Sequence, residues 1–189
     1  GPETVCPVSE INAGVYGPCG TPKPDDNSGV LRYVRIEFAG REFSTDKELA
    51  AYIKSITGIS PSNLTIYKQV FQHRSKFNEP KENNERLELL GDAILDAVVC
   101  AYLYKKYPYK EEGFMTELRS RIVNRKSLNE VGVKLGLVEK LQLNRRSMTD
   151  VSKDLGGNTF EALIGAVYLD AGFEKTKKPC GAWGLFSIC

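Results

Sequence analysis

The chain of 189 residues has the length of one ordinary domain, and its 41% hydrophobic and 26% charged residues exclude a wholly disordered or collagen-like protein. Its 26 basic and 24 acidic residues give a net charge of +2, so any contact with nucleic acid has to come from local basic patches. A single histidine excludes multi-histidine zinc sites and histidine relays. Any catalysis is therefore expected to use carboxylates, hydroxyls, lysines or a metal ion held by oxygen atoms.

The cysteines and the apolar stretches indicate the compartment. The five cysteines form no CxxC pair, and their spacing is not typical of a disulfide framework. Cys100 lies in an apolar stretch, which predicts a buried core position for it. Residues 1–9 lack a signal-peptide pattern, and the longest apolar stretch, 93–104, is interrupted by Asp96 and too short to span a bilayer. We therefore expect a cytoplasmic protein with no membrane contact.

The composition changes near residue 43. Residues 1–43 hold many of the glycines and prolines, and apolar and charged residues alternate over 30–38 as on a half-buried strand. The segment around 32–40 resembles a repeat from secreted β-rich proteins. We therefore expect residues 1–43 to form an irregular or β-like extension.

From Ser44 onward the apolar residues recur with a helical period. Capping residues, glycines and prolines set the limits of the expected helices, which cover 46–57, 63–73, 84–107, 114–135 and 157–170, with a short helix or turn over 138–143. Residues 175–189 are punctuated by Pro179, Gly181 and Gly184, and we expect no helix there. The fold class predicted for residues 44–174 is all-α, followed by an atypical tail over 175–189.

Three acids share one face of the helix expected over 84–107. Glu85, Glu88 and Asp92 lie at positions i, i+3 and i+7, and such like charges repel one another. A bound divalent cation would offset this repulsion, although a solvated acidic face gives the same pattern. Gly91 favours the first interpretation, because a glycine inside a helix usually marks a close approach. The residues expected on the opposite, core-facing side are Leu87, Leu90, Ile94, Ala97 and Val98.

The helix expected over 157–170 has a similar construction, because Glu161 shares its face with Asn158 and Gly165. The small residues around Gly165 would let this helix pack closely against another. If the two helices pack together, Glu88 and Asp92 would meet Asn158 and Glu161 in an all-oxygen site. Such a ligand set suits Mg²⁺ or Mn²⁺, the ions commonly used for phosphodiester hydrolysis.

The run ERLELLGDAIL over 85–95 closely resembles the signature helix of the ribonuclease III family. The tripeptide His73-Arg74-Ser75 and the segments 112–120 and 160–170 resemble further elements of that family, in the same order. The resemblance covers about 44–173. It implies an all-helical endonuclease domain that cleaves double-stranded RNA as a homodimer, with Mg²⁺ as the cofactor and Mn²⁺ as its substitute.

The resemblance also implies roles for single residues. Asp92 and Glu161 would be catalytic carboxylates, Glu85 a supporting acid, and the metal ligands Glu88, Asp92, Asn158 and Glu161. The family usually has aspartate at the position of Asn158, so we expect weaker metal binding here rather than an inactive site. The alternative is that Asn158 is a helix N-terminal residue without a metal role.

Contacts with a partner subunit and with RNA are also implied. Leu89 occupies a position where the family often has an aromatic residue that inserts into the partner, so it is a predicted dimer contact. Two basic clusters supply candidates for RNA phosphate contacts, although a solvated face explains them equally well. The candidates are Arg145, Arg146, Arg119 and Arg125.

Two features depart from bacterial members of the family. The sequence contains no double-stranded-RNA-binding domain, and the final helix expected after Gly172 is not evident. The two ends of the chain, which do not match the family, are explained either by a chimeric or frameshifted reading frame or by unusual extensions. Without the final helix, apolar surface of the domain would be left uncovered. The predicted function is a metal-dependent endoribonuclease acting on double-stranded RNA. The alternative is a non-catalytic module of the same fold that binds structured RNA or a ribonucleoprotein.

Overall fold

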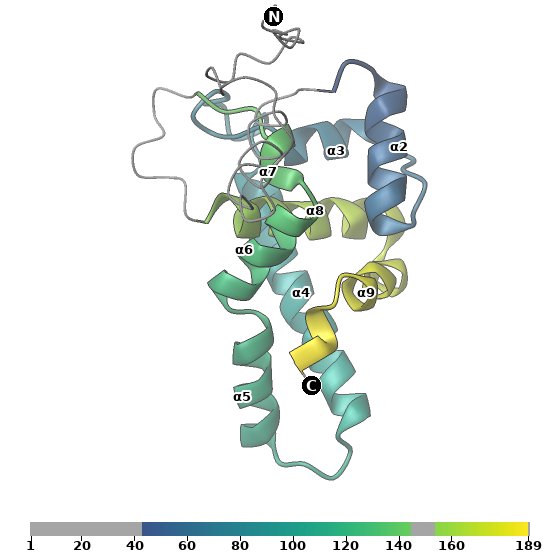
Figure 1. The fold of residues 1–189 in the computed structure, drawn as a ribbon, viewed down its shortest axis with the longest axis vertical. Helices are drawn as coiled ribbons and strands as arrows, with labels where there is room; N and C mark the ends of the chain where they lie inside the picture. The colour runs from purple at the N-terminus through teal and green to yellow at the C-terminus, as the bar shows by residue number, and fades with distance from the viewer. Residues whose placement is uncertain (1–42, 145–153, 189) are drawn as a thin grey trace, which may run out of the picture. The chain divides into compact units, whose positions relative to one another are not determined.

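The computed structural model describes residues 43–144 and 154–188, so the strand expected over 30–38 and the pair Arg145–Arg146 lie outside the described residues. Within these two ranges the chain is helical, with one isolated bridge between Gln72 and Gln142 and no strand (Figure 1), which confirms the predicted all-α class. No helix in these ranges has the length and apolar character needed to cross a membrane. The elements are α2 (Asp46–Thr57), α3 (Leu64–Val70), α4 (Glu85–Lys106), α5 (Glu112–Ile122), α6 (Arg125–Lys134), α7 (Leu137–Lys140), α8 (Leu155–Ala171), α9 (Phe173–Ala182) and the 3₁₀ helix η2 (Leu185–Ile188).

Local capping explains why the first two helices begin where the sequence predicts. The Thr45 hydroxyl accepts a hydrogen bond from the Glu48 amide, and the Asn63 side chain accepts one from the Thr65 amide. Helix α2 ends at Gly58, whose φ of 71° is a left-handed conformation that glycine adopts without strain. Helix α3 ends at Val70, before His73, because the chain then turns and pairs with residue 142.

The single helix expected over 114–135 is wrong, because the chain forms α5 and α6 with a break between them. Asn124 has an extended backbone, and its side chain accepts a hydrogen bond from the Ser127 amide, so it caps a new helix. The apolar periodicity continues across this break, since Leu118, Ile122 and Leu128 are all buried. Figure 1 shows α5 lying beside the far end of α4 as an antiparallel hairpin.

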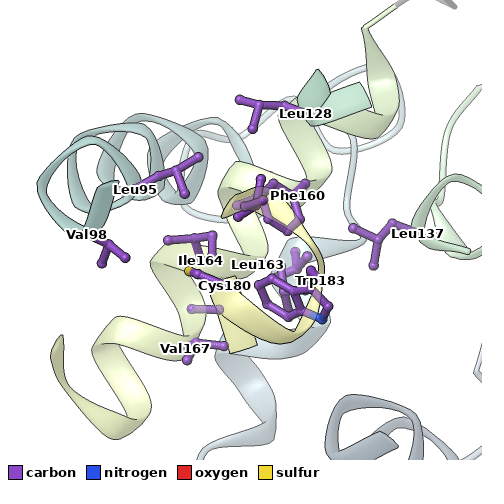
Figure 2. Packing of buried hydrophobic residues seen from close by; sticks show 14 of the residues in the cluster. Leu95, Val98, Leu128, Leu137, Phe160, Leu163, Ile164, Val167, Cys180 and Trp183 are labelled. Carbon is purple, nitrogen blue, oxygen red and sulfur yellow. The ribbon is translucent and has the colours of Figure 1, made fainter. Parts of the chain in front are cut away.

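The expectation of no helix over 175–189 is also wrong, because α9 and η2 occupy most of that segment. Pro179 lies inside α9 and lacks an amide donor, but the burial of Thr176, Pro179 and Cys180 against the core keeps the segment helical. Trp183 follows α9, packs edge-on against Phe160 at 5.1 Å between ring centroids, and donates a hydrogen bond to the Ile56 carbonyl at 2.6 Å. Figure 2 shows Cys180 and Trp183 beside Phe160, Leu163, Ile164 and Val167 of α8. Helix α9 therefore covers this part of the core.

Among the described helices α8 is central and buried along most of its length, as expected for a helix that is apolar on almost every side. It packs against α4 and α6. On α4 the buried residues are Leu87, Gly91, Leu95, Val98, Val99 and Leu103.

The core face expected on α4 is therefore only partly correct. Leu90 and Ile94 are half-buried, while Ala97 is exposed. Cys100 is exposed as well, contrary to the buried position expected for it. Helix α4 has two apolar faces, and α8 covers only one of them.

Candidate active site

Helices α4 and α8 touch through their backbones at Gly91 and Gly165. A Cβ atom built on Gly91 would lie 1.7 Å from the Glu161 carbonyl oxygen and 2.9 Å from the Gly165 amide nitrogen. A Cβ atom on Gly165 would lie 2.4 Å from the Leu87 carbonyl oxygen. These distances leave no room for any side chain, which confirms the close approach that the two glycines indicate.

This crossing brings together the acids that the sequence singles out. Gly91 directly precedes Asp92 and lies three residues after Glu88, and Gly165 lies four residues after Glu161. Glu88 and Glu161 are half-buried beside the crossing, and Asp92 is exposed. We call Glu88, Asp92 and Glu161 the acid cluster.

The charges of the acid cluster act on one another. Burial raises the pKa of Glu161 to about 7, and the nearby Asp92 and Glu88 carboxylates add to this shift. Burial also raises the pKa of Glu88, together with the carboxylates of Glu85 and Asp92. The Arg125 guanidinium opposes both shifts without cancelling them. The cluster therefore carries negative charge that the protein does not fully neutralise.

The chemistry of the donors fits a divalent cation that prefers oxygen ligands. The cluster offers three carboxylates, and the exposed Asn158 amide lies one turn before Glu161 on α8. Within 43–144 and 154–188, however, no three His, Cys, Asp or Glu side chains are placed to hold a metal ion as they stand.

Three exposed or half-exposed arginines form ion pairs around the acid cluster. Arg74 lies 3.0 Å from Glu85, which is the expected supporting acid. Arg119 lies 3.6 Å from Asp96, and Arg125 lies 2.9 Å from Asp154. Two of the predicted phosphate contacts, Arg119 and Arg125, are thus engaged with carboxylates in this structure, and the other two lie outside the described residues.

Asp96 and Asp154 lie near the acid cluster but are not predicted from the sequence as site residues. Asp96 also raises the pKa of Glu161, so its charge reaches the acid cluster. Its position four residues after Asp92 continues the spacing of the acidic face, and this signal was available in the sequence. Asp154 precedes α8 in a polar loop and gave no such signal.

The turn at His73 is built from short hydrogen bonds. His73 Nδ1 and Ser75 Oγ lie 2.9 Å apart, and the Asn144 amide donates to the same hydroxyl at 2.9 Å. The turn therefore ties the segment before α4 to the segment that follows α7. Through these contacts the His73 ring holds the turn in place, which is a structural role.

The second apolar face of α4 is open to solvent. Leu89 is 75% exposed and Tyr104 is 73% exposed. Between the far end of α4 and α5 lies a groove of about 540 Å³. Its apolar lining includes Ala101, Leu103, Tyr104 and Met115.

Comparisons with known proteins identify one family for the helical part of the chain. A family model described as "Ribonuclease-III-like" matches residues 63–185. Ribonuclease 3 of Bacteroides thetaiotaomicron is 44% identical over 140 residues, which cover 72% of this chain and 45% of that protein. Ribonuclease 3 of Azobacteroides pseudotrichonymphae is 40% identical over 143 residues, which cover 74% of this chain and 54% of that protein. The chain thus spans about half the length of the curated relatives it matches.

The solved structures give the same result. The nuclease domain of ribonuclease III from Campylobacter jejuni is similar with a TM-score of 0.64 and 30% identity, covering 73% of this chain and 94% of that domain. Another structure of that domain, with a TM-score of 0.63 and 31% identity, covers 70% of this chain and 93% of that one, and was described for flexibility in a region involved in dimer formation.

A second family model, described as "Pectate-lyase like beta helix domain", matches residues 3–73. Most of this match lies outside the described residues. The part that the structure describes contains the helices α2 and α3. The predicted boundary near residue 43 and the nature of the extension therefore stay predictions.

Proposed function

The chain belongs to the ribonuclease III family, and we propose that it is a metal-dependent endoribonuclease that hydrolyses phosphodiester bonds of double-stranded RNA during RNA processing. The observation that carries this proposal is the crossing of α4 and α8 at Gly91 and Gly165. It holds Glu161 beside Asp92 and Glu88, with its pKa raised to about 7. A nuclease of this kind would meet its RNA in the cytoplasm, which we keep as the proposed location.

Glu88, Asp92 and Glu161 would hold Mg²⁺, with the Asn158 amide oxygen as a neutral fourth donor, and Mn²⁺ would bind the same oxygens. When bound, the ion would polarise the phosphodiester and lower the pKa of a water molecule. Asp92 is the most exposed acid of the cluster, and its carboxylate would orient that water and accept its proton. Glu85, held by Arg74, would support the negative potential at the edge of the cluster.

Double-stranded RNA has two strands, and a homodimer would present one acid cluster to each. The exposed Leu89 and the groove near Tyr104 lie on the same open side of α4, which supports a self-complementary interface. In such an interface Leu89 of each copy would be buried by its partner.

The decisive experiment is cleavage of a long RNA duplex with Mg²⁺, with the size and ends of the products measured. We expect cleavage by the wild-type chain, none with EDTA, and a loss of at least about a hundredfold in Glu161→Gln. The matched control is Glu174→Gln, which removes an acid of α9 that pairs with Lys177 on its own helix. Cleavage that survives EDTA or Glu161→Gln would overturn the proposal.

The second candidate is a non-catalytic module that binds structured RNA or a ribonucleoprotein. Asn158, which offers an amide where the family usually has a carboxylate, favours it. Titration with Mn²⁺ separates the two candidates. Binding only above millimolar concentrations, together with retained RNA binding and no cleavage, would support the module.

A further inference from the structure

Arg125 combines a fixed position with an exposed guanidinium. It is the first residue of α6, and its Nη1 atom lies 2.9 Å from an Asp154 carboxylate oxygen. The Arg125 side chain nevertheless remains 87% exposed. Because a guanidinium carries five N–H donors in a planar fork, one carboxylate contact leaves most of them free for another ligand.

The position of Asp154 connects this ion pair to the acid cluster. Asp154 lies at the start of α8, four residues before Asn158 and seven before Glu161, so the three share one face of the helix. The start of α8 is locked to α6, since the Gly156 amide donates to Asn129 Oδ1 at 3.0 Å. Farther along α6, a Cβ atom on Gly132 would lie only 2.1 Å from the Gly156 carbonyl oxygen. The helix that Arg125 begins is therefore packed closely against the start of α8, the helix that carries Glu161.

The charge of Arg125 reaches the cluster as well. It lowers the pKa of Glu161 and of Glu88, against the effect of burial and of the neighbouring acids. An exposed ion pair such as Arg125–Asp154 contributes little to stability, typically about 0–1 kcal/mol. The ion pair therefore does little for the fold, while it leaves most of the Arg125 guanidinium accessible to a ligand.

An RNA strand that approaches three carboxylates is repelled unless cations at the rim offset the repulsion. We propose that Arg125 binds an RNA phosphate beside the acid cluster, and that Asp154 is the positioning residue that orients its guanidinium. This inference rests on the proposed function, because it needs RNA to occupy the face that carries Glu161. Bidentate contact with phosphate oxygens is a geometry that arginine provides and lysine does not.

The test measures binding of a fluorescent RNA duplex by the full chain across a range of salt concentrations, with Ca²⁺ in place of Mg²⁺ and the RNA checked for intactness. We expect Arg125→Ala to weaken binding about tenfold and to lower the salt slope by about one. The matched control is Lys126→Ala, which removes an equal charge from the next, also exposed, residue of α6. Equal effects of the two substitutions would overturn the role of Arg125.

Asp154→Asn tests the positioning role, because the two explanations predict opposite changes in RNA affinity. General electrostatics predicts that the loss of an acid tightens RNA binding, whereas loss of a positioning residue weakens it. We expect weaker binding, and no further loss when Asp154→Asn is added to Arg125→Ala. Asp154 makes no side-chain capping hydrogen bond to α8, so the substitution is expected to leave the fold intact, as thermal melting would verify.

The outcomes separate this inference from the proposed function. If the wild-type chain does not bind the duplex, the proposed function fails. If it binds and Asp154→Asn tightens binding, or acts equally with and without Arg125, only the positioning role fails. Arg125→Lys should restore the salt slope but not the affinity, since lysine supplies the charge without the planar fork.

Discussion

The surroundings of Glu161 are unusual for a carboxylate, and they point to a functional role for this residue. It is half-buried on α8 directly beside a backbone contact with α4, and burial acts on its pKa more than any neighbouring charge does. A carboxylate in such a place is costly to ionise without a counter-charge. The protein keeps it in spite of that cost, as is common for groups that serve a functional site.

A first prediction concerns the stability of the metal-free protein. The pKa of Glu161 is about 7 in the folded chain and near its ordinary value of 4.5 when unfolded. The folded state thus binds more protons between these values, and the free energy of unfolding should fall as the pH rises from 5 to 8. We expect Glu161→Gln to raise the melting temperature at pH 8 in EDTA and to abolish the increase that Mg²⁺ gives the wild type.

Thermal melts at pH 5.5 and pH 8, with EDTA or with Mg²⁺, would measure these effects. Glu174→Gln serves as the control, because its carboxylate is exposed on α9 and pairs with Lys177 of the same helix. A Glu161→Gln protein that melts below the wild type at pH 8 in EDTA would contradict the assignment of Glu161 to an uncompensated site.

A second prediction concerns Asn158, which is exposed one turn before Glu161. Asn158→Asp adds a carboxylate to the donor set, so we expect Mn²⁺ to bind about tenfold more tightly and the metal-free protein to melt at a lower temperature. Calorimetric titration would measure the affinity, with Asn78→Asp in an exposed loop as the control. Equal affinities in all three proteins would show that Asn158 does not contact the metal.

At the scale of the helices, the crossing of α4 and α8 depends on two glycines. A third prediction is that Gly91→Ala destabilises the fold by about 3 kcal/mol, because its Cβ would collide with the Glu161 carbonyl. The measurement is denaturant unfolding followed by circular dichroism. Gly113→Ala is the matched control, since a Cβ at that position meets nothing within 4 Å and alanine favours a helix. If the two variants are equally stable, the close contact at Gly91 is wrong.

The helices that the sequence predicted well are those with clear signals at both ends. Thr45 and Gly58 set the limits of α2, and α4 ends at Lys106 with Tyr107 as its C-cap, directly before Pro108. The break at Asn124 was missed because buried residues keep their helical spacing on both sides of it, so periodicity alone cannot detect the new cap.

Long-range packing explains the remaining differences. Pro179 and the glycines near it argue against a helix locally, yet Trp183 and Cys180 insert into the core and hold α9 in place. The glycines on the two acidic helices indicated that each could pack closely against another helix, and the structure shows that they pack against one another. The ion pairs of Asp96 and Asp154 with arginines from α5 and α6 join distant segments that no local pattern connects.

At the scale of the whole molecule, the open apolar face of α4 is the main feature left unexplained by a single chain. Leu89 and Tyr104 are among the largest apolar side chains exposed on the described residues, and half-buried Leu90 and Ile94 extend the same face. The exposed Cys100 lies between them on the helix. A contiguous apolar face of this kind on a soluble helix usually marks an interface.

The last prediction is that Leu89→Glu dissociates the proposed homodimer. Full burial of one leucine contributes roughly 1.5–3 kcal/mol, and a two-fold interface counts every contact twice, so the dissociation constant should rise at least about a hundredfold. Sedimentation velocity at several protein concentrations would measure it.

Leu169→Glu is the matched control, because Leu169 is also exposed, at 53%, but on α8. The monomeric variant should keep its helical content and its Mn²⁺ affinity, because the acid cluster lies within one chain, yet lose cleavage of both strands at one site. A wild type that sediments as a monomer, or a Leu89→Glu protein that stays dimeric, would assign the open face of α4 to some other contact.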